Sequence, residues 1–179
     1  MLAEAKLRTQ NLQAKMLEKG IQKAVFTDES SMAYLAGFWG YLGIEFGRPS
    51  MLVIDANEPP IIITPLMESE MVGEMTWVED VRVWEDIGQR TWWRALAEAL
   101  GDKPAEIWIE KASIPAIVRN HLDETYPDAA LRDISPILGR HLTQDEADER
   151  YTAWDIGLSA ETIDEYYSKK QEQAEATQS

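Results

Sequence analysis

Strand and helix signals alternate along the first 140 residues, and this order constrains the fold more than any other feature. Short apolar or alternating runs that are typical of strands lie at 23–27, 50–54, 60–64, 81–84, 106–110 and 130–133. Amphipathic or capped segments predict helices over 2–17, 28–35, 65–75, 90–100 and 113–126, with a short one from 136. The runs 50–54 and 60–64 are separated by turn residues at 55–59, which predicts a hairpin. We therefore expect an α/β domain, a mixed β-sheet flanked by helices, over residues 1–140.

The pattern changes after Arg140. Thr143 and Glu146 form a capping-box pattern, and Ser159 is a suitable cap for a second helix. Residues 141–179 hold ten of the 32 acidic side chains but only three of the 17 basic ones. The sequence therefore predicts a second segment, a helical acidic C-terminal tail over 141–179.

The composition excludes several classes of function. A net charge of −15 argues against a nucleic-acid partner, because phosphate contacts need a basic face. The longest apolar run, residues 59–65, is far shorter than the ~20 residues that cross a membrane, and the first residues do not resemble a signal peptide. The absence of cysteine excludes disulfides, zinc–thiolate sites and thiol nucleophiles. We expect a cytoplasmic protein with no nucleic-acid or membrane partner.

The two histidines give no catalytic pattern. His121 falls within the predicted helix 113–126, and we interpret it as a surface or partly buried helical residue. His141 and Asp145 are spaced i, i+4, but a catalytic metal needs three or more ligands. No Gly-x-Ser-x-Gly motif occurs. The sequence therefore predicts no catalytic residue and no metal or other cofactor held by this chain.

Residues 37–49 form a glycine-rich aromatic loop with a single cation, Arg48. Its glycines are interleaved with four large aromatic residues: Phe38, Trp39, Tyr41 and Phe46. In one interpretation this is a recognition loop, in which the aromatics supply contact area and Arg48 binds a carboxylate or a partner subunit. In the other, the aromatics cover the core and Arg48 pairs with Glu45 or another surface acid. Composition alone favours neither.

Two adjacent tryptophans, Trp92 and Trp93, lie within the predicted helix 90–100. Neighbouring helical side chains cannot both face the same core, so we expect one of them to point outward. An outward tryptophan is either an interface residue or a ring that lies across its own helix.

Several short motifs follow one another after the first amphipathic helix. They are Gly20-Ile-x-x-Ala-Val-Phe26, Tyr34-Leu-Ala-Gly-Phe38, Gly47-Arg-Pro-Ser-Met-Leu-Val-Ile54, Ile61-Ile-Ile-Thr-Pro65, Val81-Arg-Val-Trp84, Ile109-Glu-Lys111 and Asp133-Ile-Ser-Pro-Ile-Leu-Gly-Arg140. In order and spacing they resemble the N-terminal domain of the creatinase/prolidase/aminopeptidase P family, over about residues 5–140. The resemblance implies a mixed α/β domain, in agreement with the alternation of elements.

The resemblance also assigns a role to the segment Phe46-Gly47-Arg48. In creatinase-like enzymes a similar Phe-Gly-Arg segment reaches the active site of the partner subunit, where its arginine helps to hold the substrate carboxylate. Carried over, this makes Phe46 and Arg48, together with Trp39, the expected substrate contacts in trans. The expected substrate is a small amide or peptide that bears a carboxylate.

The sequence departs from the family after Arg140. There the family has a linker with a Lys-Ser or Lys-Thr pair, and then a pita-bread catalytic domain whose two Asp, one His and two Glu bind a metal pair in the peptidases. Residues 141–146, His-Leu-Thr-Gln-Asp-Glu, lack the pair, and about 220 expected residues are absent. We therefore expect a non-catalytic N-terminal domain that serves oligomerisation and lines a partner's substrate pocket, as a homo-oligomer or with a catalytic-domain partner. A divalent metal is expected only in that catalytic domain.

A second hypothesis is a free-standing interaction protein that has lost the catalytic domain and binds a partner through its acidic helical tail. Ala147, Tyr151 and Trp154 are spaced by three or four residues and form a short apolar stripe. The same stripe also suits packing against the chain's own sheet.

Overall fold

The computed structural model describes residues 2–40, 42 and 47–138, which all belong to the first of two units, residues 1–139 and 140–179. The predicted tail over 141–179 lies outside the described residues. So do its apolar stripe and His141, and the second hypothesis therefore stays a prediction. None of the described helices is long and apolar enough to cross a membrane.

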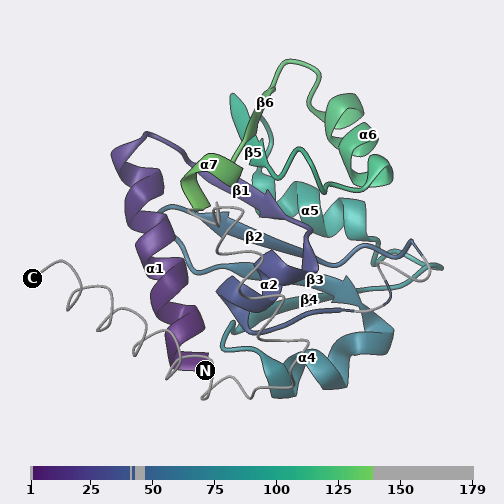
Figure 1. Cartoon of the computed structure of the whole chain (residues 1–179). Helices are drawn as coiled ribbons and strands as arrows, with labels where there is room; N and C mark the ends of the chain where they lie inside the picture. Colours follow the sequence, from purple (N-terminus) through teal and green to yellow (C-terminus); the bar gives the residue numbers. More distant parts are fainter. Residues whose placement is uncertain (1, 41, 43–46, 139–179) are drawn as a thin grey trace, which may run out of the picture. The chain divides into compact units, whose positions relative to one another are not determined.

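The described residues form one six-stranded mixed sheet in the order β4-β3-β2-β1-β5-β6 (Figure 1). The strands are β1 (Lys23–Phe26), β2 (Met51–Asp55), β3 (Ile61–Pro65), β4 (Asp80–Trp84), β5 (Glu106–Ile109) and β6 (Ala130–Asp133). Strand β2 is antiparallel to both of its neighbours, whereas the β3–β4, β1–β5 and β5–β6 pairs are parallel. Five strands therefore run in the same direction, and β2 starts at the end of the sheet where those five finish.

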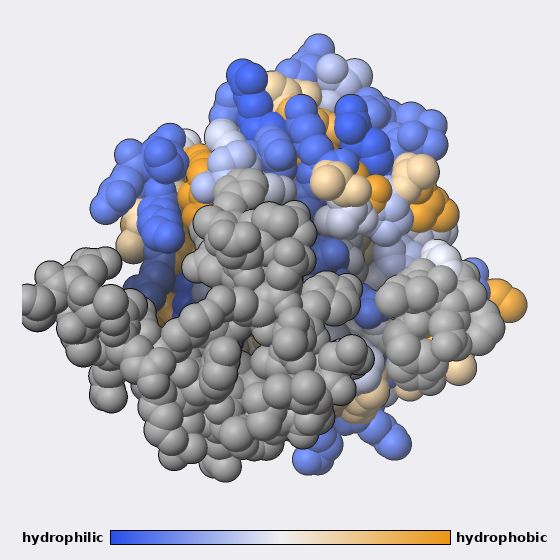
Figure 2. Space-filling model, in the orientation of Figure 1, coloured by the Kyte–Doolittle hydropathy of each residue, from blue (hydrophilic) through white to orange (hydrophobic). Residues whose placement is uncertain are grey.

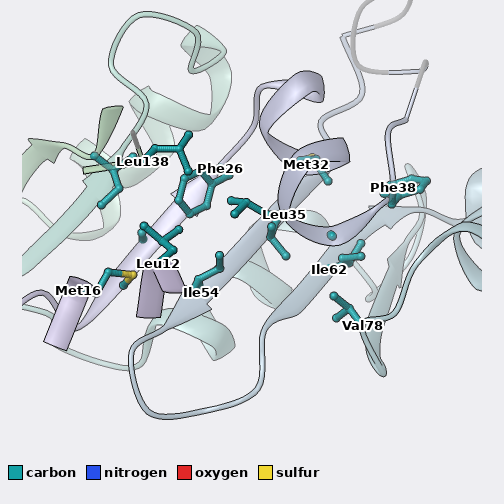
Figure 3. Close-up of a cluster of buried hydrophobic side chains, with 14 of the residues drawn as sticks. Leu12, Met16, Phe26, Met32, Leu35, Phe38, Ile54, Ile62, Val78 and Leu138 are labelled. Atoms are coloured by element: carbon teal, nitrogen blue, oxygen red, sulfur yellow. The ribbon is translucent and has the colours of Figure 1, made fainter. Parts of the chain in front are cut away.

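Helices cover both faces of this sheet (Figure 1). The first face carries α1 (Leu2–Glu18), α2 (Glu29–Ala36), α4 (Ser69–Met75) and α7 (Ser135–Leu138), and the second carries α5 (Trp92–Leu100) and α6 (Ala116–Thr125). On the first face, Leu12 and Met16 of α1 and Leu35 of α2 pack with Phe26 and Ile54 of the sheet (Figure 3). Burial of these apolar side chains from both sides is the main stabilising contribution to the domain. The predicted α/β fold is confirmed.

The predicted hairpin is confirmed as β2 and β3, with Met51 opposite Ile63 and Val53 opposite Ile61. Asp28 caps the second helix, since its side chain accepts a hydrogen bond from the Ser31 amide at 3.1 Å.

Not all of the large apolar residues of the amphipathic first helix are buried. Leu2, Leu7 and Leu17 are exposed by 38%, 55% and 52%, while the buried side is formed by Ala5, Thr9, Leu12 and Met16. These four are spaced by three or four residues, so they share one helix face. Thr9 belongs to it because its hydroxyl donates a hydrogen bond to the Leu35 carbonyl oxygen at 2.8 Å.

Three helix starts also differ from expectation. Pro65 is the last residue of β3, and the helical segment after it begins as a 3₁₀ turn, η1 (Leu66–Glu68). Helix α5 begins at Trp92 rather than at residue 90, and α6 begins at Ala116, directly after Pro115, rather than at residue 113. Such shifts of one to three residues are expected at helix ends, where local signals are weak.

The two adjacent tryptophans of α5 differ in burial, as expected. Trp92 is 5% exposed and packs in the core of the second face, whereas Trp93 is 47% exposed. The His121 ring lies edge-on to Trp92, with 5.2 Å between the ring centroids, and its burial lowers the pKa of the imidazole. His121 is thus the partly buried helical histidine that its position predicts.

On the face shown in Figure 2, the coloured surface is mostly hydrophilic, with separate small apolar patches.

Candidate functional site

The polar groups of greatest interest lie at one end of the sheet. Strands β1, β3, β4 and β5 finish there and β2 starts there, so the segments 27–31, 47–50, 66–68, 85–87 and 110–113 share this end. In open α/β sheets this end, beyond the carboxyl termini of the strands, is where ligands commonly bind.

The glycine-rich loop connects α2 to β2 at this end. Gly37 ends α2 with a left-handed φ of +77°, and its amide donates to the Ala33 carbonyl oxygen. Phe38 is fully buried in the core on the first face of the sheet, whereas the next residue, Trp39, is 49% exposed. Phe38 therefore covers the core, while Trp39 is available for contact. Phe46, the third expected site residue, lies outside the described residues.

The main chain around Arg48 is held on both sides. The Arg48 amide donates to the Leu42 carbonyl oxygen at 3.2 Å. The carbonyl oxygen of Pro49 accepts a hydrogen bond from the buried indole Nε1 of Trp84 at 3.1 Å. Gly47 has a φ of +63°, a left-handed conformation that other residues rarely adopt. These contacts set the point from which the Arg48 side chain leaves the backbone.

The Arg48 guanidinium contacts groups that follow β3 and β4. Its Nη2 lies 2.5 Å from Asp86 Oδ2, and its Nη1 lies 3.1 Å from Met67 Sδ. The Arg48 and Asp86 side chains are 34% and 53% exposed. The structure thus pairs Arg48 with a surface acid, as one of the two interpretations expected, and the acid described is Asp86. Because exposed ion pairs contribute only about 0–1 kcal/mol, the pairing leaves the guanidinium available to a ligand carboxylate.

Glu68, which the sequence analysis did not single out, is a buried carboxylate under this loop. It is 1% exposed, and Oε2 accepts hydrogen bonds from Thr64 Oγ1 at 2.7 Å and Ser50 Oγ at 3.0 Å. Its Oε1 accepts from the Leu42 amide at 3.1 Å. The hairpin register brings the hydroxyls of Ser50 and Thr64 together at the end of two apolar runs, but no signal in the sequence places Glu68 beside them.

A second buried carboxylate, Glu110, follows β5. It accepts hydrogen bonds from the amides of Thr27 and Asp28 at 3.3 and 3.2 Å, and from the Ser31 hydroxyl. Burial raises the pKa of Glu110, and the hydrogen bonds offset part of that effect. This carboxylate joins the end of β5 to the start of α2 and thereby orders the neighbouring wall of the site.

A cavity of about 360 Å³ adjoins the loop. Among its lining residues are Asp28, Glu29, Gly47, Ser50 and Ile117. Burial, together with the charges of Asp28 and Glu68, raises the pKa of Glu29. The cavity wall is therefore acidic, whereas Arg48 supplies a positive charge next to Gly47.

No group of three or more His, Cys, Asp or Glu side chains suited to hold a metal occurs among the described residues. Within the described part of the site, the arrangement offers recognition of an anion by Arg48, flanked by exposed apolar side chains.

The described residues thus form a three-layer α/β domain, with helices on both faces of one mixed sheet. The family model for the "Creatinase/Prolidase N-terminal domain" matches residues 8–140, and the chain belongs to this family. No curated protein matches the sequence.

Three solved structures illustrate the likeness. The Creatinase/Prolidase N-terminal domain of an X-Pro dipeptidase from Streptococcus pyogenes has a TM-score of 0.62 at 17% identity, and the match covers 73% of this chain and 95% of that one. A proline dipeptidase from Streptococcus agalactiae gives a TM-score of 0.64 at 17% identity, with coverages of 76% and 98%. Dipeptidase PepE from Mycobacterium ulcerans gives 0.66 at 24% identity, covering 82% of this chain but only 39% of that one. These likenesses show the fold.

Proposed function

We propose that this chain is a non-catalytic domain of an Xaa-Pro peptidase-like hydrolase that contributes Arg48 to the substrate pocket of a partner subunit. The observation that carries the proposal is the presentation of Arg48. Its backbone is fixed by Leu42 and Trp84, while its guanidinium stays partly exposed beside Asp86. A guanidinium held in this way binds a carboxylate through two parallel hydrogen bonds once the surface acid is displaced. The substrate class is a small amide or peptide with a free carboxylate.

The surface near Arg48 supports association with another subunit. Met67, which contacts the guanidinium, is 69% exposed, its neighbour Leu66 is 43% exposed, and Ile87 next to Asp86 is 87% exposed. Exposed methionine and aliphatic side chains beside an arginine are typical of protein interfaces. The partner is a second copy of the chain or a separate catalytic domain, and any divalent metal belongs to that catalytic domain. Trp39 and Phe46 are proposed as further contacts. A cytoplasmic location suits a chain without cysteine.

The absence of independent activity is tested on the purified chain. We expect no hydrolysis of Xaa-Pro dipeptides with added Mn²⁺, Co²⁺ or Zn²⁺, beside a two-domain proline dipeptidase as the positive control. Turnover that persists through re-purification would show that the chain is itself an enzyme. Light scattering on the same sample measures whether the chain self-associates.

The role of Arg48 is tested by assembling the chain with a family catalytic domain whose own N-terminal domain has been removed. Replacement Arg48→Ala should weaken substrate binding by roughly 2–4 kcal/mol, because one bidentate carboxylate contact is lost. Arg119→Ala is the matched control, since Arg119 also pairs with a surface acid, Asp123, but lies on α6. Equal KM values for the two variants would remove Arg48 from the substrate pocket.

A further inference from the structure

The buried carboxylate of Glu68 has an unusual set of partners. Among the described residues, the three groups that donate hydrogen bonds to it are neutral: the Leu42 amide and the hydroxyls of Ser50 and Thr64. A charged group removed from water is costly unless its hydrogen bonds are well formed, and replacing it with an apolar residue is often favourable for stability. Stability alone is therefore a weak reason for a carboxylate at this position. A role in holding the backbone of the loop near Arg48 accounts for the contacts that the carboxylate makes.

A continuous series of contacts leads from Glu68 to Arg48. Glu68 Oε1 accepts from the Leu42 amide, and the carbonyl oxygen of the same Leu42 accepts from the Arg48 amide at 3.2 Å. Glu68 Oε2 accepts from Ser50, two residues after Arg48. One carboxylate thus fixes the loop before and after Arg48, and Leu42 itself is only 2% exposed.

The Leu42 amide can only donate, so the atom that faces it must be an acceptor, whereas the hydroxyls of Ser50 and Thr64 can donate or accept. A glutamine can therefore keep the Leu42 contact, whereas a leucine of similar size removes every acceptor at this position. Gly40 leaves the necessary space, since a Cβ added there would lie 2.5 Å from Glu68 Oε2 and 2.9 Å from Ser50 Oγ. Gly40 and Glu68 are therefore matched to each other.

We propose that Glu68 is a positioning residue for Arg48: through Leu42 and Ser50 it fixes the backbone from which the guanidinium is presented to a substrate carboxylate. The enzymatic consequence of this inference rests on the proposed function of Arg48. The positioning itself is a property of this chain alone and is measured separately.

The first measurement is amide hydrogen exchange by NMR on the whole chain. In Glu68→Leu, which removes the acceptor of the Leu42 amide, the amides of Leu42 and Arg48 should exchange about tenfold faster or more, while amides in the β2–β3 ladder keep their protection. Glu70→Leu, which replaces an exposed carboxylate on α4, should leave both amides unchanged. If Glu68→Leu does not fold, Gly40→Ala displaces the same carboxylate and should give the same local effect. Unchanged exchange at Leu42 and Arg48 in a folded variant would overturn the inference.

The second measurement is the kinetics of the assembly with a family catalytic domain. Glu68→Leu should raise KM about tenfold for a carboxylate-bearing substrate with kcat nearly unchanged, and it should add little in an Arg48→Ala background. Loss of folded protein would instead lower the apparent kcat without changing KM. If Arg48→Ala raises KM and Glu68→Leu does not, the positioning role is wrong. If Arg48→Ala itself has no effect, the proposed function fails, and the exchange data still decide whether Glu68 fixes the loop.

Discussion

Replacing Thr64 by valine deletes one hydrogen bond to Glu68 and keeps the side-chain volume. Thr64 Oγ1 lies 2.7 Å from Glu68 Oε2 and is fully buried, as is the acceptor. Hydrogen bonds to charged acceptors contribute about 1.5–3 kcal/mol, and the carboxylate left behind remains buried with fewer donors. Because Ser50 Oγ, 2.9 Å from Thr64 Oγ1, still donates to Glu68, we expect a loss near the middle of that range, about 2 kcal/mol.

The matched control is Thr9→Val. The Thr9 hydroxyl is also fully buried and donates over 2.8 Å, but its acceptor is the neutral Leu35 carbonyl oxygen. Its replacement should lower the free energy of unfolding by about 1 kcal/mol. Urea unfolding followed by tryptophan fluorescence measures both variants, with an unchanged m-value as the sign that the folded states are comparable. Equal losses for the two variants would refute the view that Glu68 is a charged acceptor that gains specifically from Thr64.

Three further predictions concern other parts of the domain. Gly37→Ala should lower the free energy of unfolding by well over the roughly 1–2 kcal/mol that a left-handed backbone costs, because the new Cβ would also lie 3.0 Å from a backbone oxygen of α4. Gly20→Ala is the control: its φ is +68° and nothing lies within 4 Å of the new Cβ, so the same urea titration should show the backbone cost alone. Burial raises the pKa of Glu110 above its ordinary 4.5, so its stabilising contribution is complete below pH 4.5 and is lost as the pH rises through the folded-state pKa. Glu110→Gln should therefore flatten the fall in unfolding free energy above pH 4.5, and parallel wild-type and variant curves would contradict this. Asp86→Asn should change stability by no more than about 1 kcal/mol because its pair with Arg48 is exposed, and a larger loss would show that the pair is a structural contact.

The order of elements was accessible from sequence because each strand is a short apolar or alternating run, and because α2 and α5 end at glycines. The hairpin followed from the turn residues between β2 and β3. The buried face of α1 was not accessible in full. Thr9 is polar, and its place in the core depends on the Leu35 carbonyl of another helix, which no local pattern reveals.

The sequence likewise predicted only part of the candidate site. Arg48 was recognisable as the one cation in an aromatic loop, and the structure adds its partners Asp86 and Met67, which come from later segments. Glu68 was not recognisable, because a glutamate in a helical segment after a proline is ordinarily exposed. Its burial depends on donors that lie 26, 18 and four positions earlier in the chain and meet only when the sheet forms.

Gly40 and Glu68 lie 28 positions apart in the chain, and the close contact between them should make the two positions evolve together. A Cβ at position 40 would lie 2.5 Å from Glu68 Oε2, so each position restricts the amino acids accepted at the other. Across homologous sequences, a side chain at position 40 should therefore occur together with a smaller residue at 68, and glycine at 40 with glutamate at 68. Substitution of one position alone would pass through a destabilised intermediate, so the pair should be inherited together.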